Sequence, residues 1–289
     1  MKHLLIVFLL SLSFTALSQD HLNLHGEIKD SLKIVPVEYV NIGLFEQNIG
    51  TVSNENGNFS LDVPKDYLND SLTFSRIGYT TKKICINDLL QESVNLIQLV
   101  PKLTELKEVE IKTKKITLKT KGNKTTSKTI VMGISSALSL GREVGCVIRL
   151  PNKQIVLTDF NFNVDYNRPD SAKFRLNIYD YNGEIGEIIL SENVYFTIPT
   201  NFTGKFNVDL RKYNIKIEND IFAAIEVIAV YSNGPDPNKE HDKYYYDRIN
   251  ISGTITGSKS YNREVSLGKW NKTGLSFSPG FWFQYFLNE

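Results

Sequence analysis

The stretch that decides the fold reads Gly26-Glu27-Ile28-Lys29-Asp30, Pro36-Val37-Glu38-Tyr39-Val40-Asn41-Ile42, Gly50-Thr51-Val52-Ser53-Asn54-Glu55-Asn56-Gly57-Asn58-Phe59, Asp70-Ser71-Leu72-Thr73-Phe74 and Ile77-Gly78-Tyr79. Within it, apolar and polar residues alternate over short runs, and clusters of Gly, Asn, Asp and Pro separate these runs. Such alternation is typical of strands with one buried and one solvent-facing side. Without a long helical pattern, the stretch predicts a small β-sandwich.

The same residues resemble the carboxypeptidase-regulatory-like, prealbumin-type domain common at the N-termini of Bacteroidetes envelope proteins. The resemblance implies a seven-stranded sandwich at residues 19–100, without catalytic residues, that extends another domain. It also implies an address in the envelope of a Gram-negative bacterium. The marks that carry it, in order, are Gly26-x-Ile28-x-Asp30, Pro36-Val37-x-x-Val40-Asn41-Ile42, Gly50-Thr51-x-Ser53-Asn54-x-x-Gly57-x-Phe59 and Ile77-Gly78-Tyr79.

The first residues have the pattern of a secretory signal peptide at residues 1–18. Lys2 and His3 precede an almost unbroken apolar run, Leu4–Leu12, and Ala16-Leu17-Ser18 supplies small residues where a signal peptidase cleaves. The apolar run is shorter than the roughly 20 residues that a membrane-spanning helix needs. We therefore expect an exported protein of the periplasm or cell surface, with no transmembrane span in the mature chain.

Residues 101–128 are predicted to form a closing strand followed by a basic linker. They hold nine lysines against three glutamates, and from Lys112 onward they are polar and rich in threonine. This segment is either a solvated spacer or a contact for an anionic surface such as lipopolysaccharide headgroups. Over the whole chain 33 basic residues balance 32 acidic ones, which argues against a nucleic-acid partner.

Residues 129–289 are predicted to form a second, larger β-sandwich of jelly-roll type with eight or nine strands. Ile221–Val230 is nearly continuous apolar sequence, which is typical of a central strand covered on both faces. Elsewhere apolar positions alternate with polar ones such as Lys173 and Arg175, which are expected to face solvent. This half is similar to the uncharacterised C-terminal domain that accompanies the same module in Bacteroidetes, on cues such as Arg175-x-Asn177-Ile178-Tyr179 and Gly268-x-Trp270. That likeness implies no activity.

Two cysteines, Cys85 and Cys146, each lie among apolar or β-branched neighbours. In such surroundings cysteine behaves as a small buried hydrophobic residue. We expect two separate buried thiols, and leave open whether they pair in an oxidising compartment.

Groups that could carry catalysis or bind a cofactor are few. His21 and His25 fall about 13 Å apart on the outer face of one strand, and His241 lies in a polar loop, so no zinc set is predicted. Asn54–Asn58 resembles a calcium loop superficially, but a hairpin turn with Gly57 at positive φ explains it more simply. The sequence contains no nucleophile elbow and no phosphate loop. We therefore predict no enzyme, no cofactor and no metal, with a hydrolase as a minor alternative.

Aromatic residues give the remaining interaction signal, because rings with polar edges suit half-exposed binding sites. The chain is predicted to be a non-catalytic binding or scaffolding protein whose partner is an envelope protein or a glycan. The alternative is a carbohydrate-binding accessory protein that uses exposed aromatics of the second sandwich. The same rings could instead form core and an inter-domain contact. The candidate contact residues are Tyr244, Tyr245, Tyr246, Trp270 and Trp282.

Overall fold

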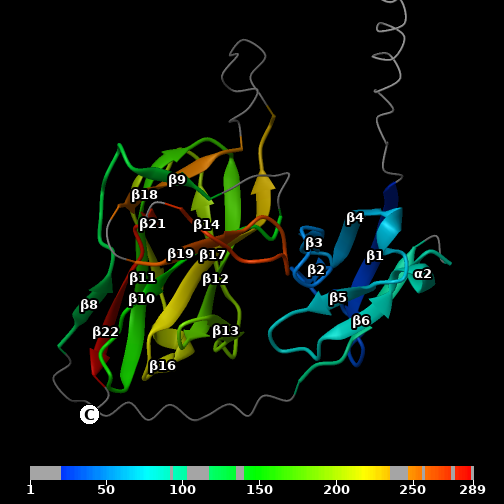
Figure 1. The fold of residues 1–289 in the computed structure, drawn as a ribbon, viewed down its shortest axis with the longest axis horizontal. Coiled ribbons are helices and arrows are strands. Elements are labelled where there is room, and N and C mark those ends of the chain that lie inside the picture. The colour runs from blue at the N-terminus through cyan, green and yellow to red at the C-terminus, as the bar shows by residue number, and fades with distance from the viewer. Residues whose placement is uncertain are drawn as a thin grey trace, which may run out of the picture.

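The structure is a computed structural model, and it describes residues 21–91, 94–102, 117–134, 140–234, 247–255, 258–274 and 277–287. These residues form two β-sandwiches, a small one followed by a larger one, which lie side by side in Figure 1. The predicted all-β class is therefore confirmed. The expected signal peptide and most of the expected closing strand lie outside the described residues. Within the described part, no helix is long and apolar enough to cross a membrane.

The small sandwich consists of two sheets. In one sheet, β1 (His21–Asp30) lies between antiparallel β4 (Asn58–Pro64) and parallel β7 (Asn95–Leu99). One turn of helix, α2 (Ile86–Leu89), and a 3-10 turn, η1 (Lys65–Tyr67), join the strands. The seven strands match the number that the family resemblance implies. The second sheet has the order β3-β2-β5-β6, whose strands span Gly50–Val52, Asn41–Gly43, Ser71–Ser75 and Lys82–Cys85.

The turn before β4 is built as predicted. The side-chain oxygen of Asn54 accepts hydrogen bonds of 2.9 Å from the backbone N–H groups of Asn56 and Asn58. Gly57 has a φ of 75°, in the left-handed region that favours glycine. The asparagines of this segment therefore stabilise a hairpin turn.

The larger sandwich packs two antiparallel sheets against each other. One has the order β13-β12-β17-β10-β19-β20, with β14 also paired to β12. Its strands are β10 (Glu143–Ile148), β12 (Ser171–Tyr181), β13 (Ile185–Ile188), β14 (Val194–Pro199), β17 (Ile221–Tyr231), β19 (Ser260–Arg263) and β20 (Asn271–Lys272). The other is centred on β11 (Ile155–Asn167) and contains β8 (Lys119–Gly122), β9 (Val131–Gly133), β15 (Gly204–Asp209), β16 (Lys216–Ile217), β18 (Ile249–Thr254), β21 (Ser278–Pro279) and β22 (Trp282–Leu287).

The core of the larger sandwich lies between its sheets and is rich in phenylalanine. Phe160, Phe174 and Phe283 are among its fully buried side chains, and many ring centroids there lie 5–6 Å apart. The first eight residues of β17 are buried, as predicted for a central strand. Because β17 is buried on both faces, other residues must also cover the outer face of its sheet.

Two sequence predictions need correction here. Lys119–Gly122 was placed in the linker, but it forms β8, which pairs with β22 at a sheet edge (Figure 1). Lysines on such an edge discourage pairing with other chains, and their polarity made the segment look like a spacer. The strand number was also too low: among the described residues the two sheets contain seven and eight strands. Several span only two to four residues, which is too short to leave a visible alternation.

Candidate functional site

A row of four charged side chains crosses the outer face of the sheet that contains β17. In the strand register, Arg175 of β12 lies opposite Glu226 of β17. Glu226 lies opposite Glu143 of β10, and Glu143 lies opposite Arg263 of β19. The four residues are buried, with exposed fractions of 3%, 0%, 0% and 7% in the order Arg175, Glu226, Glu143 and Arg263. Two carboxylates therefore lie side by side, each flanked by a guanidinium.

Each carboxylate of this charged row is held by its neighbouring arginine. Arg175 and Glu226 approach to 2.8 Å. On the other side, the Arg263 Nε donates to Glu143 at 3.0 Å, and the Tyr179 hydroxyl donates to it at 2.8 Å. Burial raises the pKa of Glu143, and the charge of Arg263 opposes that rise. Because an incomplete buried ion pair is strongly destabilising, the row depends on all of its hydrogen-bond partners.

The small sandwich supplies some of those partners. Asn41 of β2 donates to Glu226 Oε1 at 2.9 Å and accepts a hydrogen bond from Arg175. The backbone carbonyl of Tyr39 accepts another from Arg175 Nη1 at 3.0 Å. Lys173 donates to the Tyr39 hydroxyl at 3.1 Å and lies 4.5 Å from the centre of its ring. The charged row is therefore completed by residues of the other sandwich.

The backbones of the two sandwiches also approach closely. Gly43 and Gly50, on β2 and β3, face the carbonyl oxygen of Ser266 so closely that neither has room for a Cβ atom. The Glu46 N–H donates to the Leu267 carbonyl at 2.9 Å, and both residues have a φ of 59°. Non-glycine residues seldom adopt this conformation. Figure 1 shows β2 and β3 on the side of the small sandwich that faces the large one.

We call this contact the seam. Its residues are Tyr39, Asn41, Gly43, Glu46 and Gly50 on one side, and Lys173, Arg175, Glu226, Ser266 and Leu267 on the other.

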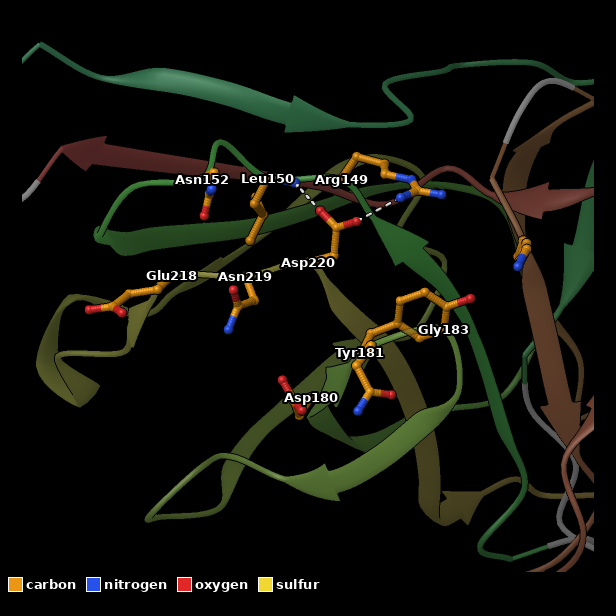
Figure 2. Close-up of a pocket in the computed structure, with 11 residues that line it drawn as sticks. Arg149, Leu150, Asn152, Asp180, Tyr181, Gly183, Glu218, Asn219 and Asp220 are labelled. Carbon is orange, nitrogen blue, oxygen red and sulfur yellow. Dashed lines mark hydrogen bonds and ion pairs between the residues drawn. The ribbon is translucent and has the colours of Figure 1, made fainter.

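A pocket of about 570 Å³ lies at one end of the larger sandwich. Figure 2 shows the loops that line it: residues 149–152 after β10, residues 180–183 at the β12–β13 turn, and residues 218–220 before β17. Lys259, just before β19, also lines it. Most of its side chains are polar, and they include three carboxylates and three asparagine amides.

Some pocket side chains are already held in place and others are free. Asp220 pairs with Arg149 at 2.9 Å and accepts the backbone N–H of Leu150 at 2.9 Å. Asp220 therefore fixes the β10–β11 loop against the start of β17. No hydrogen bond or ion pair to another described residue holds the side chains of Asp180 and Lys259. Their charges remain available to a ligand.

The aromatic residues predicted to contact a ligand or partner differ in how much of each ring is exposed. Trp282 is only 4% exposed, so it cannot offer a binding face, and that prediction is corrected. Trp270 is half-buried: its ring packs edge-on against Tyr179 and Phe222, and Arg263 lies 4.7 Å from its centroid. Tyr244, Tyr245 and Tyr246 lie outside the described residues. Trp282 is buried although it lies on the face of β22 opposite to the buried Phe283 and Tyr285, which alternation alone does not reveal.

His21 and His25 are exposed on β1, while His241 is outside the described residues. Across the described ranges, no three His, Cys, Asp or Glu side chains gather as metal ligands would. Cys85 and Cys146 are separate free thiols, the first half-buried and the second buried.

Sequence reasoning missed the charged row and the seam. Lys173 and Arg175 alternate with apolar residues, so they were expected to face solvent, yet Arg175 is buried. The available signal was the apolar run of β17, which contains Glu226 as an isolated charge. A carboxylate inside a strand buried on both faces requires a buried cation nearby.

Comparisons with known proteins bear mainly on the small sandwich. Residues 24–111 match the model of the CarboxypepD_reg-like domain family, which confirms the resemblance predicted for this part of the chain. A search of curated proteins found no match. Among solved structures, the chain is similar to the cysteine protease and lectin-like domains of Cwp84, a surface layer associated protein of Clostridium difficile, at 10% identity and a TM-score of 0.36. That match covers 57% of this chain and only 37% of the other, and a likeness this weak carries no functional argument.

Proposed function

We propose that the protein is a non-catalytic binding or scaffolding protein of the bacterial cell envelope. The observation that carries this proposal is the seam, which joins the two sandwiches through buried, hydrogen-bonded charges. If the two sandwiches separated, Arg175 and Glu226 would lose hydrogen-bond partners that Asn41 and Tyr39 supply, so the seam favours one fixed arrangement. A fixed pair of sandwiches instead holds its outer surfaces at a constant distance and angle, which suits a protein that positions partners.

The placement of the acidic residues supports a role without catalysis. Glu143 and Glu226 are adjacent carboxylates, an arrangement that a hydrolase could use. Both are fully buried, and each is paired with an arginine, so water and substrate have no direct approach to them. Three carboxylates line the pocket among the described residues: Asp220 is paired with Arg149, Glu218 accepts a hydrogen bond from Gln154, and Asp180 has no side-chain partner there. The pocket therefore lacks a pair of free carboxylates of the kind that a glycoside hydrolase uses.

The envelope address rests on the signal-like N-terminus and on the family match of the small sandwich. The family resemblance implies a domain that extends another domain of an exported protein, and we extend that address to this chain. A carbohydrate-binding role remains the second candidate. Trp282 is buried and therefore does not support a carbohydrate-binding role, and Trp270 exposes only part of its ring.

Envelope fractionation of the native bacterium, with a tagged chain, tests the proposal. We expect the chain in the periplasmic or outer-membrane fraction, and we expect cross-linking followed by pull-down to recover a specific envelope partner. Recovery in the cytoplasm would refute the address. Turnover of a substrate by the purified chain, lost on substitution of Asp180 or Glu218, would refute the non-catalytic role.

A further inference from the structure

We propose that the pocket at the end of the larger sandwich binds a neutral, hydroxyl-rich ligand of the saccharide class. The inference rests on the proposed binding role and names the ligand chemistry of one site within it. The site is the space between the β10–β11 loop, the β12–β13 turn and the segment before β17.

The pocket offers both hydrogen-bond donors and hydrogen-bond acceptors. Asn152, Asn182 and Asn219 each present an amide that both donates and accepts. Asp180 adds a free carboxylate that only accepts, and Lys259 adds an ammonium that only donates. Each hydroxyl of a sugar both donates and accepts, so a mixed lining of this kind can satisfy several hydroxyls at once.

Other ligand classes fit the lining less well. An apolar ligand needs a mainly hydrophobic wall, and Leu150 is the main aliphatic side chain among the lining residues. A phosphate or other anion needs several free cations. Arg149 is already paired with Asp220, so Lys259 is the one cationic side chain among the described lining residues without an ion pair. A metal ion needs three or more converging ligands, and none gather in the described residues.

The pocket is also a built feature. Asp220 ties the β10–β11 loop to the start of β17, so two of the three walls are fixed to each other. Tyr181, at the third wall, is 6% exposed. Its hydroxyl is buried and has no hydrogen-bond partner among the described residues. A volume of about 570 Å³ lies within the range of about 300–1,000 Å³ that small-molecule sites occupy.

Figure 2 shows Asp180 below Asn219 and Asp220, with dashed lines that join Asp220 to Leu150 and Arg149. Asp180, whose carboxylate has no hydrogen-bond or ion-pair partner among the described residues, can make a charge-assisted hydrogen bond to a ligand in the pocket.

The test is a glycan array followed by calorimetric titration with the best saccharide. The full chain is compared with the variants Asp180→Asn, Asn182→Ala and Lys259→Met, and with Asp66→Asn as the control. Asp66 is an exposed carboxylate on the small sandwich, so its substitution repeats the chemistry away from the pocket. Circular dichroism first establishes that every variant is folded.

We expect saturable binding that each pocket variant weakens about tenfold or more, since each removes a hydrogen bond to a charged or amide group. The control should bind like the parent chain. Equal weakening in the control, or binding that the pocket variants leave unchanged, would overturn the assignment of the site. No binding by any glycan at millimolar concentration would overturn the ligand class. A protein partner recovered in the same sample would still leave the proposed binding role in place.

Discussion

Replacing Asn41 by alanine should destabilise both sandwiches, although the residue belongs to the small one. The change removes the donor to Glu226 Oε1 and one acceptor for Arg175. A buried polar group that loses its partner costs about 1–3 kcal/mol, and a charged one costs more. We therefore expect the free energy of unfolding to fall by about 2–4 kcal/mol, a large part of the 5–15 kcal/mol typical of folded proteins.

Tryptophan fluorescence during urea unfolding measures the stability of the larger sandwich, where the loss of Asn41 is expected to act. The chain has two tryptophans, Trp270 and Trp282, and both lie in the larger sandwich. If the seam couples the two sandwiches, far-UV circular dichroism and tryptophan fluorescence should report one shared transition. In the Asn41→Ala variant, that shared midpoint should move to lower urea.

The matched control is Asn23→Ala on the exposed face of β1. Asn23 also makes side-chain hydrogen bonds, to Asp62 and Ser60, but it is exposed to solvent. Its replacement should change the free energy of unfolding by about 0.5 kcal/mol or less. The reasoning would be refuted by an unchanged fluorescence midpoint in Asn41→Ala, or by equal shifts in the two variants.

Three further predictions concern the small sandwich and the thiols. Gly57→Val should lower the melting temperature by several degrees, because Gly57 has a φ of 75° and a Cβ atom there would meet the backbone of Ile28 and Val37. Gly274→Val, at an open position, should leave the melting temperature unchanged, and equal shifts in the two variants would count against the predicted turn. Asp30 accepts hydrogen bonds from two backbone N–H groups and a tyrosine hydroxyl, which hold its pKa below the ordinary 3.8. A lowered carboxyl pKa stabilises the folded state above pH 3.8 and loses that contribution as the pH falls through the folded value. Melting curves between pH 5 and 2 should therefore be less acid-sensitive in Asp30→Asn than in the parent chain, and identical slopes would contradict this. In native buffer a maleimide should label Cys85 and spare Cys146, because burial raises the pKa of the Cys146 thiol to about 12. Mass spectrometry should find the second label only after denaturation. Rapid labelling of both cysteines would disprove the burial of Cys146.

Local features were predictable because they depend on neighbours in the chain. The turn at Gly57 follows from residues that adopt left-handed geometry. The buried strand β17 follows from its continuous apolar run. In each case the informative residues lie within a few positions of one another.

The candidate sites were less predictable, because they depend on contacts between distant segments. Asn41 and Glu226 are 185 positions apart, and nothing in either neighbourhood signals the other. The pocket likewise gathers three loops and Lys259, each of which reads as ordinary polar connecting sequence.

By itself, then, the sequence determined the all-β class, the order of the two sandwiches and the family resemblance of the first, because alternation and turn residues act over short range. Tertiary structure alone decided which polar faces meet solvent. An arginine at an alternating position has the same appearance in the sequence whether it faces water or another sandwich. For Arg175 the choice was made by Asn41 and Tyr39, which replace water as its hydrogen-bond partners at the seam.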